Sequence, residues 1–195
     1  GTLTLNKMTV THIAVNGDFE SAKTTSIQDA AKQHPKVYEE LVCAAALCND
    51  ASLDPDREGE IIGDPTEGAL IHMAQAFGID HETLEEEYPR VFEQPFDSDR
   101  KRMTTVHRMK NRWTAYTKGA VDEMLHILTS EGVRPVTETD RANIMKLCLS
   151  MSEDALRVLG FAMRTLTDLP VSAEEDIESD LIFIGVAGMI DPPRK

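Results

Sequence analysis

The alternation of apolar and polar residues predicts strands and helices in an irregular order. Stretches rich in β-branched and aromatic residues predict strands at 8–15, 91–96, 102–108, 112–118, 157–163 and 181–190. Apolar residues at helical spacing predict helices at 37–48, 65–77, 81–87, 120–128 and 139–154. Because several strands follow one another through hairpin-sized connections, we expect an α/β fold of the α+β kind. Its sheet would be twisted and mostly antiparallel, with helices flanking it.

Turn and capping residues mark the ends of several of these elements. Asn16-Gly17 is a strong hairpin signal, and the polar stretch 49–63 is typical of a loop. Asp64 is placed to cap a helix with proline at its first position, and Glu67 to close a capping box. Gly119 ends a strand just before the predicted helix 120–128, whose free N–H groups would face an approaching ligand.

Composition indicates one globular domain. The chain has 195 residues, of which 41% are hydrophobic, and no apolar run reaches the ~20 residues that span a bilayer. Its formal net charge of -14 argues against nucleic acid as a partner, since phosphate-backbone binding needs an extended basic face. The three cysteines lack metal-site spacing, so we expect reduced thiols and no metal site. We therefore expect a monomeric domain that is not inserted in a membrane.

One segment departs from this acidity. Residues 100–118 contain seven Lys or Arg side chains and no Asp or Glu. A hairpin with its turn at Met109-Lys110 would place Lys101 directly opposite Lys118, an unfavourable pair unless an anion lies between them. Phe96, just upstream, offers a flat apolar surface. The pattern predicts a pocket for an anionic, planar ligand, with solvated lysines and a core Phe96 as the alternative.

Sequence signatures of catalysis are missing from the chain. It has no GxxxxGK[ST] loop, no GxGxxG fingerprint and no HExxH or zinc-ligand spacing. No Ser–His–Asp arrangement is evident either. The residues therefore predict ligand binding without catalytic groups, which makes a freestanding phosphatase or kinase the weakest hypothesis.

Five ordered motifs resemble one known family, the nucleotide-binding domains of P-type cation-transporting ATPases. They are Asp64-Pro-Thr-Glu-Gly-Ala-Leu70, Phe96-Asp-Ser-Asp-Arg-Lys-Arg-Met103, Thr117-Lys-Gly-Ala120, Leu156-Arg-Val-Leu-Gly-Phe-Ala162 and Gly188-Met-Ile-Asp-Pro-Pro-Arg194. The resemblance covers the whole chain and is closest to the calcium-pump and sodium-pump branch.

The resemblance also implies a division of the chain. Residues 1–5, Gly1-Thr-Leu-Thr-Leu5, resemble the end of the family's phosphorylation motif. The aspartate that is phosphorylated would lie upstream of Gly1, so we expect no catalytic residue in this chain. The segment 1–5 would precede a nucleotide-binding domain at 6–190 and a hinge at 191–195.

The resemblance further implies roles for individual residues. Phe96 would stack on adenine, while Glu67, beside Thr66, would accept a hydrogen bond from the adenine amino group. The remaining ATP-binding residues would be Lys101, Lys118, Gly119 and Arg157, the last of them reaching toward the phosphates. The hinge would consist of Asp191, Pro192, Pro193 and Arg194.

The implied function is binding of ATP so that its γ-phosphate reaches an aspartate outside this chain. The chain alone would bind ATP without hydrolysing it, and Mg²⁺ would be held mainly by the phosphorylation domain. The parent would be an integral membrane enzyme that pumps calcium, of bacterial type, with sodium, potassium or another cation as the alternative ion. This domain would lie in the cytoplasm and meet the phosphorylation and actuator domains. A different hypothesis is an acidic interaction domain that docks an acidic partner through its basic hairpin and binds no nucleotide.

Overall fold

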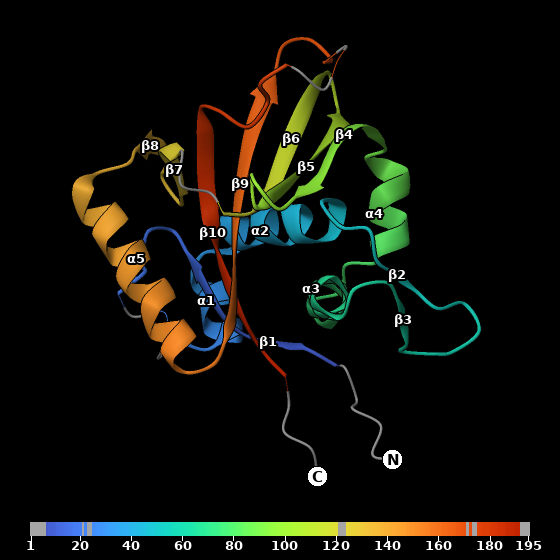
Figure 1. Ribbon diagram of the computed structural model, residues 1–195, viewed down its shortest axis with the longest axis horizontal. Helices are drawn as coiled ribbons and strands as arrows, with labels where there is room; N and C mark the ends of the chain where they lie inside the picture. Colours follow the sequence, from blue (N-terminus) through green and yellow to red (C-terminus); the bar gives the residue numbers. More distant parts are fainter. Residues whose placement is uncertain are drawn as a thin grey trace.

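The computed structural model describes residues 7–20, 22, 25–120, 124–170, 172 and 175–191. Helices and strands alternate irregularly along this chain (Figure 1). The helices are α1 (Ile27–Gln33), α2 (Pro35–Leu47), α3 (Pro65–Ala76), α4 (His81–Glu87) and α5 (Glu138–Glu153). The strands are β1 (Thr9–Val15), β2 (Ser52–Leu53), β3 (Ile61–Ile62), β4 (Arg90–Asp97), β5 (Arg102–Met109), β6 (Arg112–Gly119), β7 (Met124–Thr129), β8 (Gly132–Pro135), β9 (Arg157–Leu166) and β10 (Leu181–Ile190).

In the described part of the chain, eight strands form one sheet in the order β4-β5-β6-β9-β10-β7-β8, with β1 paired to β10. All pairs are antiparallel except β10 with β7. One edge of β10 is divided between two strands, because β7 pairs with its first residues and β1 with residues 185–190. The expected fold class, a mainly antiparallel sheet flanked by helices, is confirmed.

Helices cover both faces of this sheet. One core cluster packs α2 and α3 against the face that carries Tyr116, Phe161 and Ile184. A second cluster packs α5 against the opposite face, around Phe183 and Val186. In Figure 1, α5 and α3 stand on either side of the lower halves of β9 and β10. No helix in the described ranges is long and apolar enough to cross a membrane.

Most predicted elements form close to their expected bounds. The helix at 81–87 and the strand at 181–190 match α4 and β10 residue for residue. The strand predicted at 8–15 is one residue shorter, as β1, and the other predicted strands are longer by one to three residues. Asn16 and Gly17 do form a tight turn with φ of 62° and 76°, and the N–H of Asp18 donates to the carbonyl of Val15. The hairpin itself is wrong, because the next element along the chain is α1. Within the expected loop at 49–63, β2 and β3 make a small two-stranded sheet.

The predicted helix at 120–128 is wrong. Residues 124–129 form β7, which pairs with both β10 and β8. Met124 and Ile127 are buried in the α5 cluster, so the sheet edge offered by β10 outweighs the local helical spacing. Gly119 is therefore followed by a strand, and a helix N-terminus does not contribute to the site at this point of the described chain.

The predicted domain boundaries fall largely outside the described residues. Gly1, upstream of which the phosphorylated aspartate is expected, lies outside them together with the rest of segment 1–5. The hinge residues Pro192, Pro193 and Arg194 are not described either. Asp191, the first residue of the predicted hinge, is exposed directly after β10. The assignments of the terminal segment at Gly1 and of the hinge therefore stay predictions.

Candidate functional site: a cavity at the sheet between helices α3 and α5

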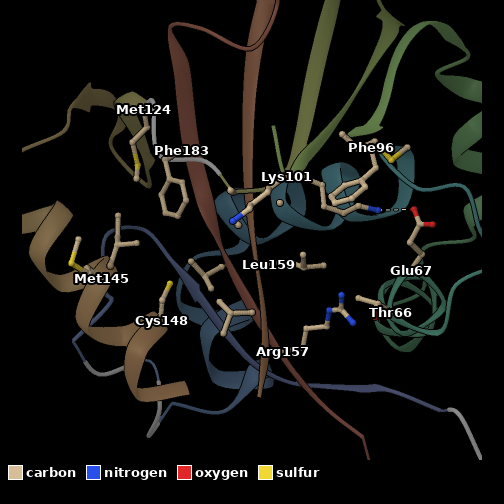
Figure 2. Close-up of a pocket in the computed structure, with 18 of the residues that line it drawn as sticks. Thr66, Glu67, Phe96, Lys101, Met124, Met145, Cys148, Arg157, Leu159 and Phe183 are labelled. Carbon is tan, nitrogen blue, oxygen red and sulfur yellow. Dashed lines mark hydrogen bonds and ion pairs between the residues drawn. The ribbon is translucent and has the colours of Figure 1, made fainter. Parts of the chain in front are cut away.

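A cavity of about 930 Å³ lies between α3 and α5 (Figure 2). Its volume is near the upper end of the range of about 300–1,000 Å³ that is usual for small-molecule sites. All seven residues predicted to bind a ligand line it, although they come from different elements: Thr66, Glu67, Phe96, Lys101, Lys118, Gly119 and Arg157. The structure thus brings together residues that lie up to 91 positions apart in the chain, from Thr66 to Arg157.

The N-terminus of α3 supplies Thr66 and Glu67. Asp64 caps this helix, since its carboxylate accepts from the backbone N–H of Thr66 at 2.7 Å and of Glu67 at 3.4 Å. Buried Asn49 donates to the carbonyl of Glu67 at 2.9 Å and to that of Ala45 at 3.0 Å. The amide of Asn49 therefore joins the first turn of α3 to α2, and the two cavity residues sit on a fixed backbone.

Glu67 pairs with Lys118. The Lys118 Nζ donates to Glu67 Oε2 at 2.7 Å, and Lys118 is only 7% exposed. The same oxygen accepts from the backbone N–H of Asp50 at 2.9 Å. The reciprocal half of the predicted capping box is therefore not made among the described residues, because the Glu67 carboxylate faces Asp50 and Lys118 instead. The Glu67–Lys118 ion pair itself carries no net charge, and Asp50 and Asp64 also line the cavity.

The predicted register of the β5–β6 hairpin is wrong by two residues. Met103, not Lys101, lies opposite Lys118, and Met109 lies opposite Arg112. The reason is the turn, which is formed by Lys110 and Asn111, with Lys110 at a φ of 53°. A two-residue shift keeps each side chain on its face of the sheet, so Lys118 still points into the cavity. The expected repulsion between Lys101 and Lys118 across the ladder is absent.

Phe96 and Lys101 flank the turn between β4 and β5. Phe96 is 65% exposed, so the alternative that it belongs to the core is wrong. Lys101 has a φ of 57°, and its carbonyl accepts from the N–H of Ala120 at 3.0 Å. Gly119 allows this approach, because a Cβ there would collide with the Lys101 carbonyl oxygen. The end of β6 and the Lys101 turn are thereby held together at the cavity wall.

Arg157 begins β9 on the opposite side of the cavity. It is exposed and lies across from Met189 in the ladder with β10. Its guanidinium points toward Thr66 in Figure 2. Cationic groups of Lys101 and Arg157 therefore stand at separate places on the wall, whereas the charge of Lys118 is matched by Glu67.

An apolar part of the cavity was missed by the sequence-based reasoning. It is lined by side chains of α5, β7, β9 and β10: Met124, Ile144, Met145, Cys148, Leu159, Phe183 and Val186. Burial raises the pKa of the Cys148 thiol, so this cysteine is a neutral part of the wall. Apolar residues at helical spacing predicted α5 itself, but no local signal distinguishes cavity residues from core residues.

Carboxylates neutralise much of the cationic segment at 100–118. Arg100 and Arg102 form ion pairs with Glu178, at 2.7 Å and 3.6 Å, and Lys118 pairs with Glu67. Among the described residues, Lys101, Arg108, Lys110 and Arg112 form no ion pair. The last three cluster at the far end of the hairpin, where Lys110 and Asn111 turn the chain. The surplus positive charge at the cavity is thus much smaller than the sequence suggested.

Comparison with known proteins identifies the family of this chain. A family model described as "P-type ATPase, cytoplasmic domain N" matches residues 37–195. The chain belongs to this family. A calcium-transporting ATPase of Bacillus cereus is 39% identical over the whole chain, which spans 21% of that relative's length. A calcium-transporting ATPase of Lactococcus lactis is 35% identical and a cation-transporting ATPase of Synechocystis 36% identical, again over the whole chain. This N domain spans 22% and 23% of those two relatives.

Proposed function

We propose that this N domain binds ATP in the cavity between α3 and α5. The observation that supports the proposal best is that all seven residues expected to bind ATP line this one cavity. Family membership supports the same reaction class, since the relatives are named as ATPases. The contacts around each residue suggest how the nucleotide would lie.

Adenine would lie between Phe96 and the Glu67–Lys118 pair. Stacking of a base on an aromatic ring contributes about 1–3 kcal/mol, and the exposed Phe96 ring has room for it. Glu67 Oε2 already accepts from Lys118 and Asp50, whereas Oε1 accepts no hydrogen bond from the described residues. This second oxygen is available to the adenine amino group. The nearly neutral pair suits a neutral base better than an unpaired lysine would.

The phosphates would extend toward Lys101 and Arg157. Both are cationic, and neither is paired with a carboxylate in the described part of the chain. Arg157 is exposed, so a phosphate bound there stays accessible to a reacting group outside this domain. ATP binding here would orient the γ-phosphate for in-line transfer to an aspartate of the phosphorylation domain, which gives an aspartyl-phosphate.

Magnesium would be held mainly outside this chain. No group of three His, Cys, Asp or Glu side chains in the described ranges could hold a metal ion. The chemistry that Mg²⁺ would supply is neutralisation of the charge that develops during phosphoryl transfer. The work of this domain would be to bind and orient the nucleotide. We therefore expect the isolated chain to bind ATP and to release no phosphate from it.

The parent protein would be a calcium pump in a membrane. Relatives from Bacillus cereus, Lactococcus lactis and Saccharomyces cerevisiae are all named as calcium-transporting ATPases. Another is named only as cation-transporting, so a pump for sodium, potassium or another cation is the alternative. In such a parent, the phosphorylation and actuator domains of the same polypeptide would be the partners of this domain.

Titration of the isotope-labelled chain with ATP tests the site. We expect saturable amide shifts at Phe96, Lys118 and Gly119, with a Kd on the order of 0.1–1 mM, or about 4–5.5 kcal/mol. Phe96→Ala should weaken binding about fivefold, the lower end of the stacking energy. Phe77→Ala is the matched control, because Phe77 packs against Tyr38 at the far end of α3. Unmoved amides at several millimolar ATP would contradict the proposal and favour the docking hypothesis.

A further inference from the structure

Glu178 places a buried carboxylate beside the turn that carries the nucleotide residues. It lies in the connection between β9 and β10 and is 5% exposed. One oxygen accepts from Arg100 Nε at 2.7 Å, and the other accepts from the Thr104 hydroxyl at 2.9 Å. Arg102 is a second cationic neighbour, at 3.6 Å. Glu178 does not line the cavity, so its charge and burial need another explanation.

Arg100 links this carboxylate to the backbone on both sides of Phe96 and Lys101. Its Nη2 donates to the carbonyl of Pro95 at 2.9 Å and to that of Arg102 at 3.2 Å. The ladder between β4 and β5 is irregular between Gln94 and Asp97, so Phe96 has no regular partner in β5. A guanidinium with a fixed orientation therefore replaces the missing ladder contacts around Phe96.

The turn held by Arg100 has an unfavourable backbone conformation. Lys101 lies in the left-handed region, with a φ of 57°, where a lysine is uncommon. Its N–H donates to the carbonyl of Asp97 at 2.6 Å, and the Asp97 carboxylate accepts from the N–H of Asp99 at 2.7 Å. Such a conformation persists when the surroundings over-determine it. The pair of Glu178 and Arg100 supplies that constraint from outside the cavity.

We propose that Glu178 is a positioning residue that sets ATP affinity through Arg100, by fixing Phe96 and Lys101 at the cavity wall. The proposal rests on the proposed binding of ATP in this cavity. It assigns a role in nucleotide binding to the connection between β9 and β10, whose described residues do not line the cavity. Loss of the carboxylate would release the guanidinium and let the turn sample conformations in which the Phe96 ring no longer faces adenine.

The first test compares Glu178→Gln with Asp180→Asn. Both remove one negative charge from the same connection, and exposed Asp180 has a φ of 53°, which asparagine also adopts readily. We expect Glu178→Gln to raise the Kd for ATP about tenfold, or about 1.4 kcal/mol, and Asp180→Asn to leave it unchanged. A wild-type chain that fails to bind ATP contradicts the proposed function itself. A wild-type chain that binds, with a Glu178→Gln variant of equal or higher affinity, overturns only the positioning role.

A double-mutant cycle separates positioning from general loosening of the fold. In a Phe96→Ala background the ring is gone, so Glu178→Gln should raise the Kd for ATP by much less than tenfold. If Glu178→Gln lowers ATP affinity equally in the wild-type and the Phe96→Ala chains, the proposal is overturned. If Glu178→Gln does not fold, as judged by circular dichroism, Arg100→Gln takes its place, because it cuts the same link and leaves Glu178 bonded to Thr104. If Arg100 instead contacts a phosphate directly, the losses of ATP binding free energy in Arg100→Gln and in Phe96→Ala should add, and this result would overturn the positioning role.

Discussion

Removal of the Lys118 ammonium should destabilise the fold as well as the site. In Lys118→Met the carboxylate of Glu67 keeps the N–H of Asp50 but loses its cation. Met fills much of the same volume, so the change is mainly one of charge. Glu67 has a side chain that is 17% exposed, and water can therefore replace only part of what Lys118 supplied.

The size of the effect follows from the geometry of the pair. At 2.7 Å and an effective dielectric constant of about 20, the Coulomb attraction is about 6 kcal/mol before desolvation is counted. Breaking a buried pair by removing one partner typically costs about 3–5 kcal/mol. Because Glu67 keeps one backbone donor and some water, we expect a loss of about 2–3 kcal/mol in the free energy of unfolding. The double variant Glu67→Gln/Lys118→Met leaves no unpaired charge. Its free energy of unfolding should therefore fall by less than that of Lys118→Met.

Urea unfolding of the wild type, both single variants and the double variant measures this coupling. The slope of the free energy against urea should stay constant, so that the midpoints report stability alone. Effects of the two single variants that add within about 0.5 kcal/mol would refute the reasoning, since they would show that the pair is not coupled. A double variant less stable than Lys118→Met would refute it as well.

Two further predictions concern the backbone at the cavity and a buried histidine. Gly119→Ala should lower both the unfolding midpoint and ATP affinity, because its Cβ would meet the Lys101 carbonyl oxygen. Gly132→Ala is the control, since its φ of 113° is close to the 124° of Gly119 and a Cβ there meets no atom within 4 Å; equal losses would contradict the steric argument. Burial lowers the pKa of His107 from 6.5 to about 4. As the pH falls, His107 is therefore protonated in the unfolded chain at a higher pH than in the folded chain. The free energy of unfolding should therefore decrease by about 3 kcal/mol as the pH falls from 6.5 to 4. In His107→Gln, the free energy of unfolding measured in urea should change less with pH over this range. An unchanged profile in that variant would contradict the assignment.

Short-range signals in the sequence were sufficient for most of the fold. Asp64 followed by proline predicted the start of α3, and Asp64 does cap that helix. The family motifs around Phe96 and Lys118 named residues that line the cavity, although Lys118 lies on β6, whose partner β9 is distant in the chain. Local hydrogen bonds and hydrophobic periodicity act over a few residues, and a single sequence contains both.

Long-range contacts explain what the sequence could not predict. Lys118 and Glu67 are 51 positions apart, and nothing near either one indicates that they pair. Met124 belongs to a strand only because β10 leaves an edge open beside Leu181. The hairpin register depended on whether Lys110 adopts a positive φ, which is uncommon for lysine. In the first two cases a contact between distant segments outweighed the local preference, and in the third the conformation of the turn decided the register.

The pairing of β1 with β10 has a mechanical consequence. These antiparallel strands place Thr9 beside Ile190, and the start of β1 and the end of β10 lie in the lower part of Figure 1. A torque applied through both strands would turn the domain as one body, because Thr9 and Ile190 lie side by side. A force that pulls Thr9 away from Ile190 would instead open the ladder one residue pair after another. The domain should thus transmit rotation well and resist separation of these two strands weakly.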